Sequence, residues 1–277
     1  EIADRDWSSD VCSSDLVLGW LPVCIGFIVP SSYLIYQLVQ RRDGSEIFTP
    51  SILDALSNSL QIAAITTLIC VLCAIIIVWS ARDSTTYVTS NLKSKINLMV
   101  GKVGYAIPGT MLAIGLIIPY GWIDKQINTL LSVLNQPSIG LLMLGSILGV
   151  SCACAIRFIA IAIGNVHAGM ARIPHSIDQV ARGLGATNCN LLIRVHLPLI
   201  QPALIVSILL VFVECMKELP VTLMLRPLNT ETLATLLYAD ASRGNYEESA
   251  MAALLIILAG ILPVIMLTRI DQTGKNT

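Results

Sequence analysis

Residues 179–198, QVARGLGATNCNLLIRVHLP, interrupt an otherwise apolar sequence with a polar and cationic segment. Just before this segment, Pro174 suits the first turn of a helix, where its missing N–H would be unpaired anyway. The pattern predicts a short helix over 176–184, and Gly185 is expected to end it because glycine adopts the left-handed conformation without a Cβ penalty. One face of this helix would be apolar and consist of Ile177, Val180, Ala181 and Leu184.

The second half of the segment predicts another short helix, over 188–195. Thr187 precedes it, and a threonine hydroxyl at that position accepts one of the backbone N–H groups that a first helical turn leaves unpaired. Leu197 and Pro198 are then expected to turn the chain into the next apolar segment. The sequence therefore predicts a compact helix-turn-helix bracket that is attached to apolar helices at both ends.

The composition places the chain in a lipid bilayer. Hydrophobic residues make up 55% of the sequence and charged residues only 13%, with a mean hydropathy of +0.76. Soluble domains carry about twice that share of charge. A helix needs about twenty mostly apolar residues to cross the hydrocarbon core. Segments of this kind predict an all-α, polytopic membrane protein with six transmembrane helices, at 16–40, 58–81, 103–123, 138–163, 197–216 and 249–268.

The distribution of lysine and arginine over the loops predicts the orientation of the chain. If the first helix starts inside, nine of these residues lie in cytoplasmic segments and five in outer loops. This orientation places residues 172–198 in the cytoplasm. The transmembrane domain would then cover residues 17–270, with a cytoplasmic tail at 271–277. Residues 1–16 show neither apolar periodicity nor a signal-peptide pattern and resemble a translated sequencing-adapter remnant, so we predict a non-native segment, with a polar native loop as the alternative.

Residue types that would support chemistry are sparse. Eight cysteines are scattered, and the pair Cys70 and Cys73 lies in an uncharged apolar stretch without histidine, which favours buried thiols over a metal or redox site. The sequence contains no phosphate loop of the form G-x-x-x-x-G-K-[ST]. A net charge of −1 without a basic stripe argues against a nucleic-acid partner. We therefore expect no enzyme activity, no metal and no cofactor bound by this chain.

The spacing within residues 179–198 resembles the cytoplasmic loop of ABC-transporter permeases. In that family Glu-Ala-Ala is followed after three residues by Gly, and after nine more by Ile-x-Leu-Pro. Here the family residue stands at Ala181, Gly185, Leu197 and Pro198, whereas it is replaced at Gln179, Val180 and Val195.

This resemblance implies the six-helix fold of type I importer permeases and a place in the bacterial cytoplasmic membrane. It also implies that a separate ABC ATPase subunit, which uses the ATP, docks on residues 172–198. A small apolar knob around Ala181 would enter a groove of the ATPase, with Arg182 at its rim. The missing carboxylate at Gln179 would remove an ionic contact and weaken docking.

Residues 217–227, KELPVTLMLRP, and the following Thr232-Leu233-Ala234 form a second motif. It closely resembles Lys-Glu-Leu-Pro-x-Thr-Leu-x-Leu-Arg-Pro of ferric-iron importer permeases, and the similarity covers about residues 17–270. Those permeases are long chains with two similar halves, so the resemblance implies the C-terminal half of such a chain. It further implies a second permease half, and iron(III) delivered by a periplasmic binding protein. Related permeases carry thiamine, polyamines or phosphonates, and these cargoes remain alternatives.

Charged residues in or beside apolar segments are candidates for function, since an unpaired charge in the bilayer is costly. Glu214, Lys217 and Glu218 lie near the outer end of the fifth segment, where their spacing lets all three share a helical face. They would form either an outer gate or a self-neutralising cluster. We favour the cluster for Glu214 with Lys217 and leave the role of Glu218 open.

Four further positions complete the candidates for a pore or gate. Pro108 removes a helical hydrogen bond within the third segment, and Gly109 permits close backbone approach. These two residues indicate a kinked, closely packed helix, a flexible pore-lining helix, or both. Pro220 and Arg226 would shape an outer turn, in which Glu218 and Arg226 offer charge to an arriving binding protein.

Two other classes of protein fit the sequence less well. An intramembrane enzyme needs paired catalytic groups within the bilayer, and an ion-driven secondary transporter needs acids near its midplane. No aspartate lies in the middle of a predicted helix, and the three histidines fall in or beside the loop at 172–198. The predicted function remains the one that the resemblance to ABC permeases implies, the membrane subunit of an ATP-driven importer.

Overall fold

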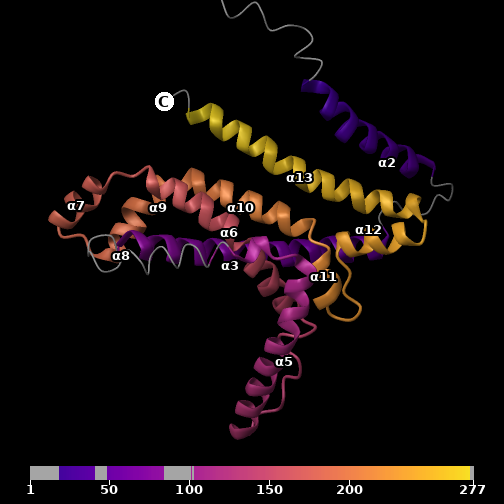
Figure 1. The fold of residues 1–277 in the computed structure, drawn as a ribbon, viewed down its shortest axis with the longest axis horizontal. Coiled ribbons are helices and arrows are strands. Elements are labelled where there is room, and N and C mark those ends of the chain that lie inside the picture. Colours follow the sequence, from indigo (N-terminus) through magenta and orange to yellow (C-terminus); the bar gives the residue numbers. More distant parts are fainter. Residues whose placement is uncertain (1–18, 41–48, 84–100, 102, 275–277) are drawn as a thin grey trace, which may run out of the picture.

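The computed structural model describes residues 19–40, 49–83, 101 and 103–274. Every regular element in these ranges is helical, which confirms the all-α prediction (Figure 1). The longer elements are α2 (Val29–Gln40), which continues from the π-helical turn η1 (Cys24–Ile28), α3 (Pro50–Asp83), α5 (Gly109–Val133), α6 (Ile147–Ala171), α10 (Gln201–Met216) and α13 (Tyr246–Gly274). Shorter helices connect them: α7 (His175–Gly183), α8 (Asn188–Leu191), η3 (π-helical, Leu192–His196), α9 (Leu197–Leu199), α11 (Pro220–Leu225) and α12 (Leu233–Ser242).

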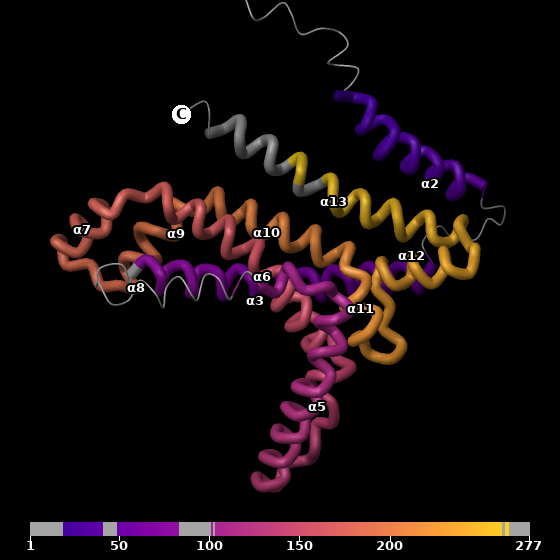
Figure 2. Tube along the Cα trace, in the orientation of Figure 1, coloured from indigo at the N-terminus to yellow at the C-terminus, as the bar shows by residue number. Residues whose placement is uncertain are grey.

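The helices α3, α6 and α10 lie side by side and form the core of the molecule (Figures 1 and 2). Small residues line their contacts, because in a membrane close backbone approach replaces the hydrophobic effect as the source of helix association. Two side chains of α3 add hydrogen bonds to α6: Thr66 Oγ1 donates to the carbonyl of Ser151 over 3.2 Å, and Cys70 Sγ to that of Ala155 over 3.5 Å. Fully buried alanines at this centre are Ala55, Ala63, Ala74, Ala153 and Ala162.

The third predicted segment, 103–123, is not one continuous helix. Pro108 has an extended ψ of 136°, so the helical hydrogen bonding stops there and α5 begins at Gly109 and runs on to Val133. As a result α5 projects away from the bundle of α3, α6 and α10 (Figure 2). Before the break the chain lies close to α6, where a Cβ on Gly104 would stand only 2.0 Å from the carbonyl oxygen of Ile156.

The fourth predicted segment, 138–163, is helical only from Ile147. Ser146 caps α6, since its hydroxyl accepts the N–H of Gly149 over 3.0 Å. The preceding residues are held in a non-helical path by Asp124 of α5, which is 2% exposed. Its carboxylate accepts the backbone N–H groups of residues 142, 143 and 144 over 3.0, 2.7 and 3.0 Å. An apolar stretch thus became a loop because a distant carboxylate satisfies its backbone donors.

The fifth predicted segment, 197–216, is sharply bent. The helical stretch 188–199 and α10 meet at Ile200 at an angle of 74°. The chain therefore turns a little beyond Leu197 and Pro198, and α10 begins at Gln201 with Pro202 in its first turn, where the absent N–H is tolerated.

Several of these helices suit a membrane. Among the residues that the structure describes, Gly19–Gln40, Pro50–Arg82 and Ile147–Ala171 are long and apolar enough to cross one, and the bent pair adds a fourth if it counts as one span. The helices α5 and α13 occupy the two other predicted segments. The bracket at α7–α9 lies at the end of the bundle where α3 ends, and α12 lies at the end where α3 begins (Figure 1).

The predicted orientation can be checked by thiol labelling. Cys189 is exposed on α8, and Leu228, which is 95% exposed, stands in the turn before α12 at the opposite end. In a chain with its other cysteines removed, an impermeant maleimide applied from outside is expected to label Leu228→Cys and to spare Cys189. Permeabilised membranes serve as the control, because both sites should then react. The reverse labelling pattern would show that the orientation is wrong.

Candidate functional site

The first helix of the bracket ends as its sequence predicts. Gly185 has a φ of +83°, and its N–H donates to the carbonyl of Arg182 over 2.9 Å, while the N–H of Ala186 donates to that of Ala181 over 3.0 Å. This pair of bonds is the glycine-dependent ending known as the Schellman motif. A Cβ at Gly185 would meet no atom within 4 Å, so the backbone conformation and not the available space requires glycine here.

Two of the four apolar side chains of α7 are partly covered by the protein, and the other two are exposed. Ile177 and Ala181 are half-buried, whereas Val180 is 63% and Leu184 85% exposed. Two neighbouring apolar side chains at this level of exposure form a projecting knob, which we call the Val180/Leu184 knob. It lies beside Ala181, around which the sequence placed the docking contact.

The second half of the bracket also begins as predicted. The hydroxyl of Thr187 accepts the N–H of Asn190 over 3.4 Å at the start of α8. The helix then widens into the π-helical η3, in which Val195 is half-buried. In the following α9, Leu197 is half-buried and Pro198 is exposed. The expected helix over 188–195 is thus present, with one wider turn in its second half.

A polar cluster on the inner side of the bracket involves residues that the sequence analysis did not single out. The carboxylate of Asp178 on α7 accepts Nε of Arg82 over 2.8 Å and Nη2 over 3.2 Å. It also lies 2.9 Å from Nε2 of His196, a side chain that is only 1% exposed. Burial opposes the charged carboxylate, but the hydrogen bonds from Arg82 and His196 outweigh it and hold the pKa of Asp178 below its ordinary value.

A second ion pair lies inside the helix bundle. Nη1 of Arg157 on α6 donates to Oε1 of Glu218 over 2.6 Å, and the same oxygen accepts the N–H of Val221 over 3.1 Å. The side chain of Glu218 is 6% exposed. The prediction that Glu218 shares a helical face with Glu214 and Lys217 is wrong, because α10 ends at Met216 and the next residues turn Glu218 toward α6.

Gly109 makes room for this ion pair. A Cβ at Gly109 would stand 2.2 Å from Nη1 of Arg157, 3.0 Å from Oε1 of Glu218 and 3.1 Å from Cβ of Pro220. The fold therefore brings the candidates Pro108, Gly109, Glu218 and Pro220 to one junction between α5, α6 and α11. This geometry favours the closely packed interpretation of Pro108 and Gly109.

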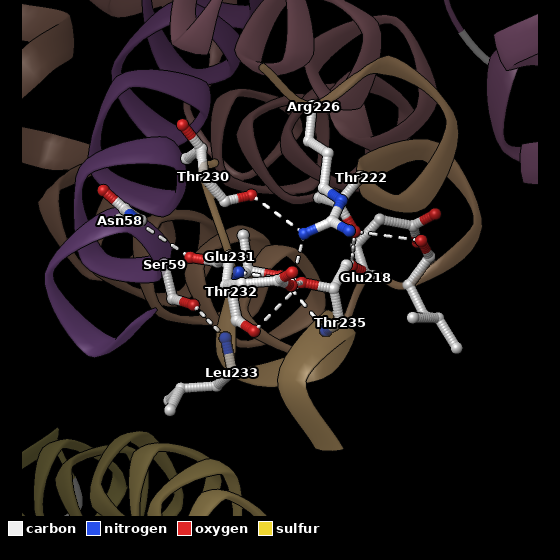
Figure 3. A network of polar contacts seen from close by, with 11 residues as sticks. Asn58, Ser59, Glu218, Thr222, Arg226, Thr230, Glu231, Thr232, Leu233 and Thr235 are labelled. Carbon is white, nitrogen blue, oxygen red and sulfur yellow. Dashed lines mark hydrogen bonds and ion pairs between the residues drawn. The ribbon is translucent and has the colours of Figure 1, made fainter. Parts of the chain in front are cut away.

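The remaining gate candidates form surface and loop contacts. Lys217 Nζ and Glu214 Oε1 are 2.8 Å apart, as the self-neutralising interpretation predicted, and the two side chains are 54% and 28% exposed. Arg226 forms an ion pair with Glu231 and donates to the carbonyl of Thr230 over 3.1 Å (Figure 3). The guanidinium of Arg226 is thus engaged within its own loop.

That loop is tied to the start of α3 (Figure 3). Asn58 donates to the carbonyl of Glu231 over 2.9 Å, and the hydroxyl of Ser59 accepts the N–H of Leu233 over 2.8 Å. Thr232 caps α12 in a capping box with Thr235. Burial raises the pKa of Glu231, but the hydrogen bonds from Arg226 and Thr235 more than offset this and bring it below its ordinary value.

Residues 84–273 match the family described as "Binding-protein-dependent transport system inner membrane component". The chain belongs to this family. It is thus a membrane permease subunit of an ABC importer, as the spacing of the bracket implied, and it is not an enzyme.

Two curated permeases are similar over most of this chain. PhnV of Salmonella typhimurium, named for a 2-aminoethylphosphonate transport system, is 27% identical over 245 residues, which are 88% of this chain and 82% of PhnV. The Fe(3+)-transport system permease protein FbpB 2 of Haemophilus influenzae is 27% identical over 247 residues, which are 87% of this chain but only 44% of FbpB 2. This permease therefore spans less than half the length of its iron-transport relative.

Solved structures share the fold. A chain of a bacterial alginate ABC transporter, in complex with an alginate pentasaccharide-bound periplasmic protein, superposes with a TM-score of 0.68 at 16% identity over 96% of both chains. A chain of the MetNI methionine ABC transporter, in an inward-facing conformation, gives 0.55 at 15% identity over 87% of this chain and 97% of that one.

The permease sequence contains one indication of the internal ion pair. Arg157 is the single charge of residues 138–163, and charges inside a membrane protein are nearly always paired, so one of the acids near the end of the next apolar segment was a candidate partner. The link between Arg82, Asp178 and His196 had no such clue, because the three residues lie in segments whose proximity only the fold reveals.

Proposed function

We propose that this permease forms part of the translocation path of an importer in the bacterial inner membrane and couples to its ATPase through α7. The observation that carries this proposal is the Val180/Leu184 knob, which projects from a bracket whose ends are fixed by Gly185 and Thr187. A knob of this kind fits a hydrophobic groove on a partner, and burial of both side chains would contribute about 3 kcal/mol or more to docking. The permease residues themselves perform no chemistry in this mechanism.

The energy of transport comes from ATP that the partner subunits bind and hydrolyse. Their movement would push the bracket, and the bracket would move the ends of α6 and α10, which lie directly before and after it in the chain. A second permease half would complete the translocation path. A periplasmic binding protein would deliver the cargo to the outer end of this path. As the bracket moves, the translocation path would alternate between a state open to the outside and a state open to the cytoplasm.

The cargo that we propose is iron(III), on the resemblance of residues 217–227 to ferric-iron permeases and the similarity to FbpB 2. In this chain Glu218, Thr222 and Arg226 of that stretch make internal contacts, so the motif serves the shape of the outer end. The second candidate is 2-aminoethylphosphonate, because PhnV matches over most of its own length.

Uptake by the reconstituted transporter distinguishes these cargoes. The full-length native permease is placed in liposomes with its ATPase, any second permease subunit and its own binding protein. We expect radiolabelled iron(III) to accumulate when ATP is supplied to the ATPase side, and 2-aminoethylphosphonate not to accumulate. Liposomes without ATP are the control. Accumulation of the phosphonate without iron would replace the cargo and leave the importer class intact, and ATP-independent accumulation of either would contradict the ATPase coupling.

A further inference from the structure

The docking helix α7 has little packing of its own. None of its nine residues is buried, although it must transmit force if the ATPase docks there. An open pocket of about 220 Å³, lined by Ile177, Leu199 and Ala203 among others, lies between Ile177 of α7 and the bend of the helix pair. Apolar contacts alone therefore hold α7 only weakly against the rest of the protein.

Asp178 supplies the missing attachment. It lies on the inner side of α7 at 15% exposure, while Val180 and Leu184 project outward. Its pKa is below the ordinary value, so it is a carboxylate at neutral pH and can only accept hydrogen bonds. It accepts two from Arg82, and Nε2 of His196 must be the donor in the third contact.

Arg82 extends this link to two membrane helices. It stands in the last turn of α3, and its Nη1 donates to the carbonyl of Met170 near the end of α6 over 2.7 Å. Nη2 donates to the carbonyl of Ile173 in the turn before α7 over 3.0 Å. The negative end of the α6 dipole favours this guanidinium, and each charged hydrogen bond is stronger than a neutral one. One side chain thus joins α3, α6 and α7.

His196 extends the link to the bent helix pair. It belongs to η3, directly before α9, and its ring is almost completely buried. Among the described residues, Nδ1 of His196 has no hydrogen-bond partner, so the contact with Asp178 is the polar interaction that fixes the ring. Movement of α7 would therefore pull on η3 and, through it, on α10.

We infer that Asp178 is a positioning residue of transport, whose contacts with Arg82 and His196 make the docking helix one rigid body with the inner ends of α3, α6 and η3. This inference rests on the proposed docking of the ATPase on α7. Without the link, α7 would still bind the ATPase, but it would rotate about its two flanking turns. The movement of the ATPase would then not reach the membrane helices. The expected defect is thus uncoupling of hydrolysis from transport, with docking preserved.

The test uses the complete reconstituted transporter with Asp178→Asn and His196→Gln. We expect the ATPase to co-purify in parental amounts and to hydrolyse ATP, while the radiolabelled iron(III) transported per ATP hydrolysed falls by about tenfold or more, the size of a typical coupling between sites. His175→Gln is the matched control. His175 Nδ1 lies 3.8 Å from the same carboxylate but the side chain is 67% exposed, so the amount transported per ATP hydrolysed should not change. If Asp178→Asn fails to assemble, His196→Gln, which removes only one contact, decides the question.

A spectroscopic measurement separates positioning from general stability. Spin labels at Gln179→Cys and Leu199→Cys, both exposed sites, report the distance between α7 and α9 in a chain without other cysteines. The distance distribution should be narrow in the parent and broad after Asp178→Asn. A parental transport ratio together with a narrow distribution in Asp178→Asn would overturn the inference alone. Full ATPase binding by Leu184→Asp would instead overturn the proposed docking, and the inference with it.

Discussion

Leu184→Asp is expected to detach the ATPase from the permease and to abolish transport. Leu184 is 85% exposed at the end of α7, so the substitution places a carboxylate on the proposed docking surface without disturbing the permease itself. Docking would desolvate that carboxylate with no partner, which costs about 2 kcal/mol or more and corresponds to a roughly 30-fold weaker complex. Co-purification of the ATPase with the tagged permease, together with ATPase-driven uptake in liposomes, measures the effect.

Leu228→Asp is the matched control for this experiment. Leu228 is also a fully exposed leucine in a connection, at 95%, but it lies before α12 at the opposite end of the bundle. The ATPase should remain bound to this variant. Parental ATPase binding by Leu184→Asp, or an equal loss in both variants, would show that the docking surface has been misplaced.

Local chemistry made the bracket the most predictable part of this molecule. A left-handed glycine and a capping threonine act on backbone groups within a few residues, and Gly185 and Thr187 fix the ends of α7 and α8 as predicted. Apolar composition predicted helices in all six regions, but it cannot tell a buried helix from an apolar loop. That ambiguity produced the error at 138–146, where the deciding group is the carboxylate of Asp124 many residues earlier.

Pairings across the fold were the least predictable part of the site. Arg157 and Glu218 are separated by 61 residues, and Arg82 and Asp178 by 96, so no spacing rule connects them. Helical periodicity instead suggested that Glu218 shares a face with Glu214, an argument that failed because α10 ends between the two. For α7, periodicity named Val180 and Leu184 only as members of a four-residue apolar face, and their exposure in the structure distinguishes them from the other two residues.

Removing the charge of Glu218 from its buried ion pair with Arg157 is expected to destabilise the permease. Glu218→Gln keeps the volume of the side chain but leaves the charge of Arg157 without its counter-charge inside the bundle. We expect a loss of stability of about 3 kcal/mol, at the lower end for a broken buried pair because Arg157 remains 22% exposed. A fall in the Tm of the purified permease complex, measured in nanodiscs, reports it. Loosening of the junction at Gly109 should reduce uptake in parallel.

Two further variants decide whether the charge is the cause. Glu214→Gln breaks the partly exposed pair with Lys217, and the stability should change by less than about 1 kcal/mol because solvent reaches both side chains and screens that pair. Arg157→Leu combined with Glu218→Leu removes both charges and should recover most of the lost Tm, since a well-packed apolar pair is often as stable as a buried ion pair. An equal loss in Glu214→Gln, or a double variant as unstable as Glu218→Gln, would refute this account. Recovered stability without recovered uptake would show that the charges also act in transport, beyond holding α5, α6 and α11 together.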